Sequence, residues 1–247
     1  MARVLLMRLD APLMSFGGAS VDNHGYVEAY PAFSMLTGLF ANALGWRYEE
    51  FGRLQRLQGR LHFAARCDLP GEPLIDFQTV ALGQNSMSDK LGWTTRGKIE
   101  KRDGGSSKET HIRYRHYLAN AVYTLGVRLE PEDESPNIDS LAEALKQPSR
   151  PLFIGRKCCI PSAPLLLTVT EAFSPLSALK ALPRIERWGI RTRGPLSVWW
   201  DAEAERDETK AMEQIAVSDG RDWANQVHVG RRFIYHGEIT PPDAGAA

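Results

Sequence analysis

The 247-residue chain lacks several features that mark familiar protein classes. Its three cysteines, Cys67, Cys158 and Cys159, provide neither a disulfide framework nor the CxxC spacing of a structural zinc site. No apolar run approaches membrane-spanning length, and the run at residues 4–7 is too short for a signal peptide. These absences predict a soluble, cytoplasmic protein with reduced thiols and no membrane contact.

Signatures of common catalytic sites are also missing. The chain contains no P-loop, no GxSxG elbow, no HExxH motif and no GxGxxG motif. None of the six histidines is spaced from another histidine, a cysteine or an acid as metal ligands on one helix would be. We therefore expect no metal and no cofactor.

Net charge is absent overall but present locally. The chain has 30 basic and 30 acidic residues, which argues against a lysine-coated binder of polyanions. Residues 84–117 nevertheless hold eight basic and four acidic residues, with four glycines and three aromatic residues among them. A positively charged, aromatic-bearing arm suits phosphates and unstacked bases. A long solvated loop is the other interpretation, and composition alone does not separate the two.

Hydrophobic periodicity predicts alternating strands and helices over the first 170 residues. We expect strands at residues 4–9, 61–67, 74–82, 118–129 and 165–170, and helices at 31–44, 49–57 and 137–146. Asn137 is expected to cap the last of these helices. The order is β-α-β, then the basic arm, then β-α-β. It is compatible with a ferredoxin-like unit, the fold also used by RNA-recognition domains.

The pattern of predicted elements changes beyond residue 174. A short helix at residues 175–182 precedes an aromatic strand at 198–200, an acidic stretch at 201–208 and a final β segment at 227–239. The acidic stretch is interpreted as a solvated turn or short helix. We predict an α+β protein with a domain at residues 1–173 that carries the arm at 84–117, and a small β-rich region at 174–247.

Two basic clusters are candidate sites. Lys108, His111, Tyr114 and His116 lie close together at the return of the arm, and a base beside a cation would suit metal-free RNA cleavage. We favour RNA-contacting or structural roles, because neighbouring residues on a strand point to alternating faces. The second cluster is Arg150 with residues 155–157, where a glycine and two cations suit a phosphate, although an ordinary surface turn would look the same.

Several motifs, spread in order over nearly the whole chain, resemble the CasD family of CRISPR-associated proteins. They are LDAPLMSFG at residues 9–17, PAFSMLTGL at 31–39, RYRHYL at 113–118, PSRPLFIGRKC at 148–158 and DGRDW at 219–223, with Gly230, Arg231 and Arg232. Members of this family, part of the RAMP superfamily, are subunits of the type I-E Cascade surveillance complex.

The resemblance implies a modified ferredoxin-like (RRM/RAMP) fold with a projecting thumb hairpin. The thumb and palm would clamp the 5′ handle of the guide (CRISPR) RNA. The partners would be the Cascade backbone subunit and the large PAM-reading subunit, with target DNA reached only through the complex. A separate subunit cuts the precursor RNA in type I-E systems, so this one would be non-catalytic. A related branch in type I-C systems processes the precursor itself, which leaves a metal-independent endoribonuclease as the alternative.

The resulting hypothesis is a non-enzymatic RNA-binding subunit for antiviral defence, with no catalytic residues. The RNA-binding candidates are Lys90, Arg96, Lys98, Lys101, Arg102, Lys108, Arg113, Tyr114, Arg115, His116, Gly155, Arg156 and Lys157. Trp93, Tyr114 and Phe16 are candidates for stacking on a base, although burial in the core is the commoner role of such residues. A structural adaptor whose arm docks on another protein is a third hypothesis.

Overall fold

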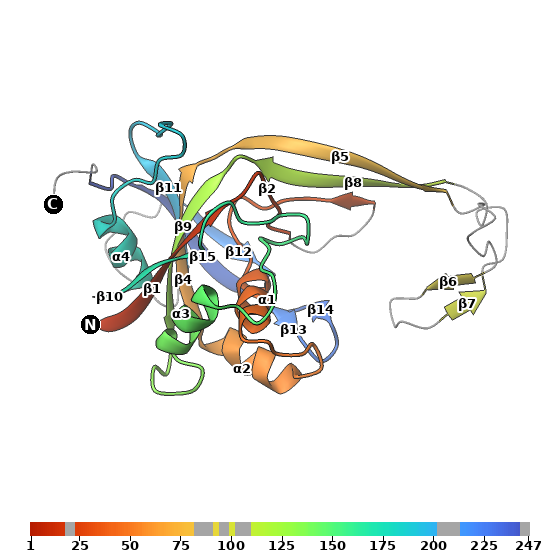
Figure 1. Cartoon of the computed structure of the whole chain (residues 1–247), viewed down its shortest axis with the longest axis horizontal. Coiled ribbons are helices and arrows are strands. Elements are labelled where there is room, and N and C mark those ends of the chain that lie inside the picture. Colours follow the sequence, from red (N-terminus) through yellow and green to blue (C-terminus); the bar gives the residue numbers. More distant parts are fainter. Residues whose placement is uncertain (18–22, 82–90, 94–98, 102–109, 202–212, 243–247) are drawn as a thin grey trace.

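The computed structural model describes residues 1–17, 23–81, 91–93, 99–101, 110–201 and 213–242, with the backbone alone described within residues 80–111. Seven antiparallel strands form its main sheet, in the order β10-β1-β9-β4-β11-β15-β12 (Figure 1). Their bounds are Leu166–Ala172, Ala2–Asp10, Val122–Leu129, Leu61–Leu69, Leu196–Asp201, Arg232–Ile239 and Glu213–Val217 in that order.

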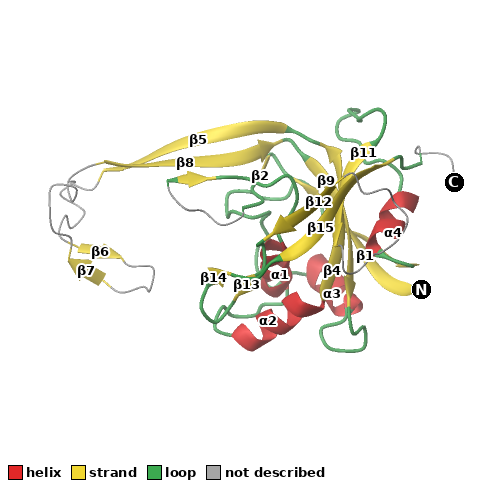
Figure 2. Cartoon of the chain, turned by 180° about the vertical axis from the view of Figure 1, so that it is seen from behind, coloured by secondary structure: helices red, strands yellow, loops and turns green. Residues whose placement is uncertain are grey.

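Helices cover both faces of this sheet, as the two views of the chain show (Figures 1 and 2). One face packs against three helices, α1 (Phe33–Ala43), α2 (Phe51–Arg60) and α3 (Ile138–Lys146). The other face packs against α4 (Pro175–Ala181). Alternate residues of β1 contribute to the two cores, with Leu5 and Met7 in the first and Val4 and Leu6 in the second. Burial on both faces explains why β1 is a continuous apolar run.

Local signals set the ends of two helices as the sequence predicts. The Asn137 side chain accepts a hydrogen bond of 2.9 Å from the backbone N–H of Ser140, which confirms the expected cap of α3. Ser174 and Ser177 form a reciprocal capping box at the start of α4, and Pro175 occupies its first turn. No helix within the described part of the chain is long and apolar enough to cross a membrane.

A buried ionic network fixes the segment that follows α4. Arg66 on β4 is inaccessible to solvent and donates to the carbonyl oxygens of Leu179, Leu182 and Pro183 at 2.7–2.9 Å. Its guanidinium also pairs at 2.8 Å with Asp68, which is itself buried. A charge this deeply buried is tolerated because several hydrogen bonds satisfy it. The network ties α4 and the chain after it to the central strand β4.

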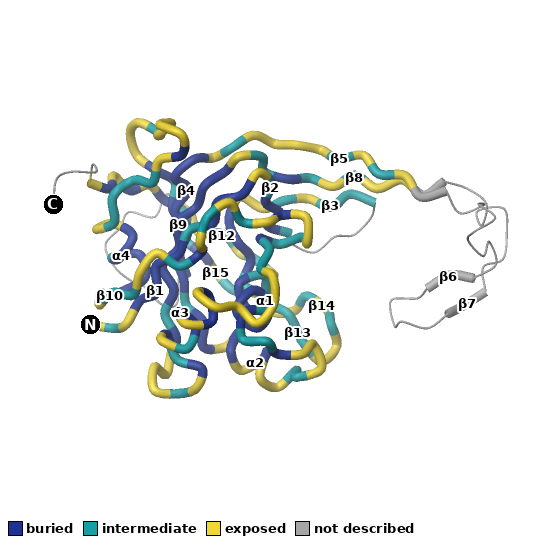
Figure 3. The backbone as a smooth tube through the Cα atoms, viewed as in Figure 1, coloured by how far each residue is buried: buried dark blue, intermediate teal, exposed yellow. Residues whose placement is uncertain are grey.

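A long two-stranded arm projects from one end of the main sheet (Figure 1). It consists of β5 (Glu72–Ala81) and β8 (Thr110–Ala119), which pair without a break from Glu72 opposite Ala119 to Ala81 opposite Thr110. Two short strands, β2 (Leu13–Met14) and β3 (His24–Gly25), also pair with β8. Between β5 and β8, the chain contains β6 (Leu91–Trp93) paired with β7 (Ile99–Lys101). The arm is largely exposed, in contrast to the buried main sheet (Figure 3).

The predicted mixture of helices and strands is confirmed, and two details differ. The expected strand at residues 118–129 is wrong: it is two strands, because Asn120 has a φ of 58° and its N–H donates to the Pro12 carbonyl. This left-handed residue turns the chain from the arm into the main sheet. The hairpin begins at Glu72 rather than at residue 84.

The C-terminal strands continue the main sheet, because β11 pairs with β4. The β-rich segment at residues 227–239 consists of β14 (Val227–His228) and β15, and β14 pairs with β13 (Arg221–Asp222). Of the acidic stretch at 201–208, Asp201 ends β11 and the remainder lies outside the described residues.

Candidate nucleic-acid interface at the base of the arm

Strand alternation separates the consecutive candidates 113–116 onto two faces of the arm. Tyr114 and His116 lie on one face, where they pair across the hairpin with Phe77 and Ile75. Arg113 and Arg115 lie on the opposite face, across from Gln78 and Asp76. We call the first the aromatic face and the second the basic face. One strand of RNA passing over one face cannot contact all four side chains from that side.

The aromatic face is widened by β3, which runs parallel to β8 with His24 beside Tyr114. The rings of His24 and Tyr114 stack with centroids 4.6 Å apart, and Tyr26 lies 5.0 Å from His116. Phe77 contacts Tyr114 at 5.4 Å between ring centroids. The two histidines approach to 3.5 Å between Nδ1 of His24 and Nε2 of His116. Three separate segments of the chain therefore build one cluster of rings.

Much of this cluster is open to solvent. Tyr26 and Ile75 are each 59% exposed, and Phe77 is 54% exposed. An apolar patch left open on a protein surface usually marks a site of interaction. Flat rings with a partly polar rim are the groups on which unpaired bases stack. The face thus has the chemistry of a single-strand binding platform.

The basic face offers charge instead of rings. Arg113 and Arg115 are both exposed, and Arg115 lies opposite Asp76 in the hairpin register. Tyr117 continues this face toward the main sheet, but it is buried and its hydroxyl lies 3.4 Å from Sγ of Cys158. Burial, with Cys158 beside it, raises the pKa of the Tyr117 hydroxyl. Tyr117 therefore anchors the arm and is not available to RNA.

Arg156, predicted as a phosphate contact, makes its contacts within the chain. Its guanidinium donates to the carbonyl oxygens of His116 at 2.9 Å and Gly25 at 3.1 Å, and lies 4.8 Å from the Tyr117 ring centroid. These bonds join β8 to β3 and so hold the two halves of the aromatic face in register. The two bonds use two of the five N–H donors of the guanidinium.

The remaining residues of this second cluster differ in exposure. Gly155 has a φ of +89°, and a Cβ there would lie 1.8 Å from the carbonyl oxygen of Ser15. Glycine is thus required here because the chain's own backbone lies against it, and not because a ligand does. Lys157 is exposed. Arg150 donates to the carbonyl oxygens of Trp46 and Gly45 at 2.8 and 2.9 Å, which makes it a structural tie.

Several predicted residues cannot be placed. Lys90, Arg96, Lys98, Arg102 and Lys108 lie outside the described residues, and for Lys101, Trp93 and His111 the structure describes only the backbone. Phe16 is wrong as a stacking candidate, because its ring is fully buried and packs edge-on against Tyr123 with centroids 5.0 Å apart. Among the described residues, no group of three or more His, Cys, Asp or Glu is arranged to hold a metal ion.

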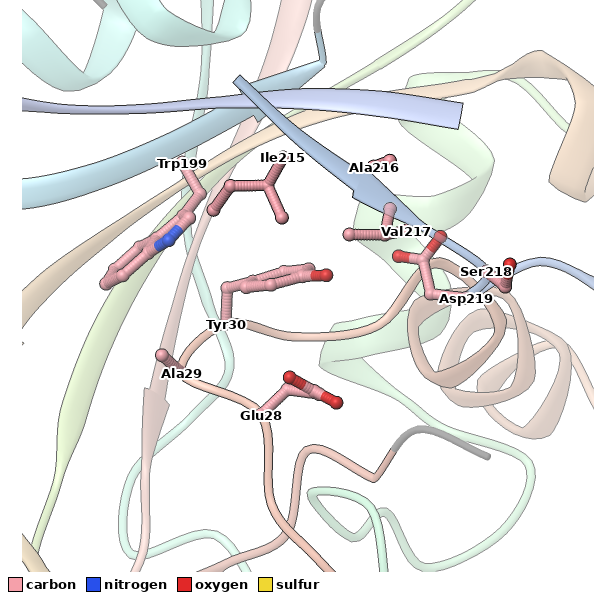
Figure 4. A pocket seen from close by; sticks show the side chains of 9 residues that line it. All are labelled: Glu28, Ala29, Tyr30, Trp199, Ile215, Ala216, Val217, Ser218 and Asp219. Atoms are coloured by element: carbon pink, nitrogen blue, oxygen red, sulfur yellow. The ribbon is translucent and has the colours of Figure 1, made fainter. Parts of the chain in front are cut away.

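A cavity of about 450 Å³ lies away from the arm, between β12 and residues 28–30 (Figure 4). Tyr30 points into it, with the carboxylates of Glu28 and Asp219 nearby (Figure 4). Burial first, and then these two negative charges, raise the pKa of the Tyr30 hydroxyl. Asp219 pairs with Arg232 at 2.8 Å and accepts from the N–H of Phe33, which fixes the start of α1. The two carboxylates beside this cavity make it less suited to phosphate than the basic face of the arm.

Comparisons with known proteins show the family of the chain. A family model described as CRISPR-associated protein (Cas_Cas5) matches residues 4–235. The chain belongs to this family. It is 30% identical over 179 residues to the CRISPR system Cascade subunit CasD of Escherichia coli (strain K12), covering 72% of this chain and 76% of that relative. The resemblance drawn from the sequence motifs is thereby confirmed.

Solved structures show that the fold is shared. A chain of a CRISPR RNA-guided surveillance complex matches with a TM-score of 0.63 and 24% identity, over 97% of this chain and 91% of that one. A crystal structure of a Cas protein matches with a TM-score of 0.66 and 24% identity, over 98% of both chains.

Sequence reasoning missed His24, Tyr26 and Phe77 as members of the site. The alternation of residues 74–82 contained a signal for Phe77, because the predicted strand puts it on the same face as Ile75. No local signal marked His24, since it reaches β8 through a two-residue parallel pairing across ninety positions of sequence.

Proposed function

We propose that the chain is a non-catalytic, RNA-binding subunit of a Cascade-type surveillance complex, in which it caps the 5′ handle of the guide RNA. The observation that carries this proposal is the exposed aromatic face, on an arm that projects from the core of a Cas5 family member. The E. coli relative is named as a Cascade subunit, which supports the assembly. Three free thiols fit a cytoplasmic location.

The core is inferred to be a modified ferredoxin-like domain with the arm as its thumb. The strand order β10-β1-β9-β4, connected as β-α-β-β-α-β with α1–α2 and α3 as the crossovers, supports this assignment. The arm inserts between β4 and β9, the second and third strands of that unit. Residues 1–173 would form this domain, and residues 174–247 its β-rich extension.

The two faces of the arm bind different parts of the RNA. Tyr114 and His116, with His24 and Tyr26, stack on unpaired handle bases. Arg113, Arg115 and the basic residues farther along the arm bind phosphates, which gives affinity without reading sequence. Those farther residues are Lys90, Arg96, Lys98, Lys101, Arg102 and Lys108. Lys157 adds a phosphate contact beside the arm, while Gly155 and Arg156 act by positioning the segment.

Protein partners complete the proposal. The aromatic face and the basic face give the arm two surfaces, and a strand of RNA that lies on one of them leaves the other open. The backbone subunit and the large PAM-reading subunit are the expected neighbours, and target DNA is reached only through the complex. An apolar surface such as that of Ile75 and Phe77 suits a protein contact wherever RNA leaves it open.

A metal-independent endoribonuclease remains a second candidate because of one observation. His24 and His116 lie 3.5 Å apart beside Tyr114, and two imidazoles can serve as base and acid in cleavage at a 2′-hydroxyl. The close stacking of these rings favours binding instead, since a reacting phosphate needs room between acid and base.

Precursor RNA that contains a repeat tests the two candidates in one experiment. The purified chain is incubated with it in EDTA, alongside Tyr114→Ala and His116→Ala variants. The binding proposal predicts intact RNA throughout, with weaker retention by both variants. Site-specific cleavage that disappears in His116→Ala would establish the nuclease. A pure adaptor would show no salt-dependent RNA affinity when tested alone, and the two variants would leave the RNA affinity of the reconstituted complex unchanged.

A further inference from the structure

A highly exposed aromatic side chain lies on the turn at residues 187–190, outside the aromatic face. Trp188 is 77% exposed and Ile190 60%. Arg187 and Ile190 exchange backbone hydrogen bonds of 3.1 and 2.9 Å, while Trp188 and Gly189 have φ values of 53° and 73°. A two-residue turn with positive φ at both positions favours Asn-Gly, and a bulky ring at the first position is disfavoured. The chain thus has a tryptophan at a position where the backbone conformation disfavours it and where its ring is not buried.

The base of this turn is rigid. The Arg187 side chain, only 5% exposed, pairs at 3.1 Å with the buried Asp10 and donates at 3.3 Å to Asn120. Asp68, part of the buried network of β4, accepts from the N–H of Ile185 at 3.0 Å, and its carbonyl accepts from the Thr192 hydroxyl at 2.6 Å. Both ends of the segment are therefore tied to the main sheet. Trp188 therefore lies on a turn whose two ends are held by the main sheet.

A cavity of about 320 Å³ separates the turn from the root of the arm. Trp188 and Ile190 line it on the side of the turn, and Leu69, Pro70, Gly71 and Ala119 line it on the side of the arm. Asn120 and Glu72 contribute polar groups to the same lining. This volume is open to solvent and lies beside a flat aromatic ring. It can admit a planar ring with polar edges.

The charge of the segment favours an anionic ligand. Residues 184–193 contain four arginines and one glutamate, so the net charge stays positive although Arg187 pairs with Asp10 and Arg191 with Glu186. The guanidinium of Arg187 lies 4.1 Å from the Trp188 ring centroid and covers one side of the indole. Arg193 is exposed, and Arg191 is 48% exposed beside Glu186. Cations around an open aromatic ring are the combination that single-stranded nucleic acids bind.

We propose that this turn is a second binding site for single-stranded nucleic acid, separate from the arm site of the proposed function. An unpaired base stacks on the open side of Trp188, above the cavity, and the flanking phosphates lie near Arg191 and Arg193. The cavity reaches the hairpin at the pair Glu72–Ala119, and the aromatic face includes the pair Phe77–Tyr114. These two pairs are five residues apart along the hairpin. That is about 17 Å at the rise of an antiparallel strand.

A short labelled oligonucleotide of unrelated sequence tests the proposal. Its fluorescence anisotropy is measured with the full-length chain at low salt, once with RNA and once with DNA. Trp188→Asn removes the ring and installs the residue preferred at this turn position, so its melting temperature should stay unchanged or rise. We expect its affinity to fall by about fivefold or more, the range for loss of one stacked base, and Trp188→Phe to lose less. Phe173→Ala removes an equally exposed ring, 76% exposed, and should change nothing.

The outcomes separate this site from the arm. The oligonucleotides carry no handle sequence, so a failure of handle capping leaves the expected loss in Trp188→Asn intact. Loss of affinity for RNA alone assigns the ligand to RNA, and loss for both assigns it to any single strand. Failure of the wild-type chain to bind either oligonucleotide contradicts the proposal. Equal affinity of wild type and Trp188→Asn also contradicts it, and a protein subunit lost from the variant complex would then identify a protein contact.

Discussion

Replacing Arg156 by alanine tests whether this residue positions the arm or binds RNA directly. The side chain donates to the carbonyl oxygens of His116 and Gly25 and covers the Tyr117 ring. The contact with Gly25 is so close that a Cβ at that glycine would lie 2.5 Å from Nη2 of Arg156. Removing the guanidinium therefore leaves two carbonyl groups without this donor and removes a side-chain link between β3 and β8, which stay paired through their backbones.

The size of the effect follows from these contacts. Each of the two hydrogen bonds contributes about 1 kcal/mol for a half-buried donor. The contact with the Tyr117 ring adds about 0.5–1 kcal/mol. Arg156→Ala should thus lower the free energy of unfolding by about 2–3 kcal/mol. Arg156→Lys should recover only part of it, because an ammonium cannot reproduce the planar fork between two carbonyl groups. The exposed neighbour Lys157, changed to alanine, serves as a control with an effect within about 0.5 kcal/mol.

Urea denaturation of the three variants measures these differences, with RNA binding followed on the same samples. Unchanged stability of Arg156→Ala would refute the positioning role. A direct phosphate contact would instead leave the fold intact and reduce the slope of affinity against salt by about one.

Three further outcomes are expected. Gly155→Ala should destabilise the fold by at least 2 kcal/mol, because the new Cβ would clash with the Ser15 backbone at a φ of +89°. Gly189→Ala, at a φ of +73° with open space around it, should cost about 1 kcal/mol, and thermal denaturation compares the two variants. Iodoacetamide at neutral pH should label the exposed Cys158 and spare Cys67 and Cys159, which are buried, until the protein is denatured; mass spectrometry counts the adducts, and equal labelling of all three would contradict the fold. Burial raises the pKa of Cys67 from 9.0 to about 11. The free energy of unfolding should therefore fall between those pH values, because the thiol of the unfolded chain ionises first. Cys67→Ala should show a shallower decline, and identical pH profiles would contradict this assignment.

Local patterns in the sequence were enough for elements whose signals are local. The buried strand at residues 4–9, the Asn137 cap and the Pro175 helix start each depend on neighbouring residues, and each is observed. The break at Asn120 was missed because apolar and β-branched residues on both sides of it continue a strand pattern. Only the partner strands decide that β8 belongs to the arm and β9 to the main sheet.

The candidate site was predicted in part for the same reason. Tyr114 and His116 lie in a segment whose charge and aromatic content are unusual, so composition pointed to them. His24 became part of the site through strand pairing, which no spacing rule reveals. Arg156 is a phosphate candidate in the sequence because it is a cation beside a glycine, whereas the two carbonyl groups to which it donates are brought near it only by the fold.

The central claim is that the aromatic face holds the 5′ handle of a guide RNA. The most direct test is photo-crosslinking in the reconstituted complex, with 4-thiouridine placed at each handle position in turn. Peptides that cross-link to the handle should contain Tyr114, His116 or His24, and Tyr114→Ala should remove or shift those cross-links. A handle that cross-links only to other subunits, with no adduct on β3 or β8, would contradict the account.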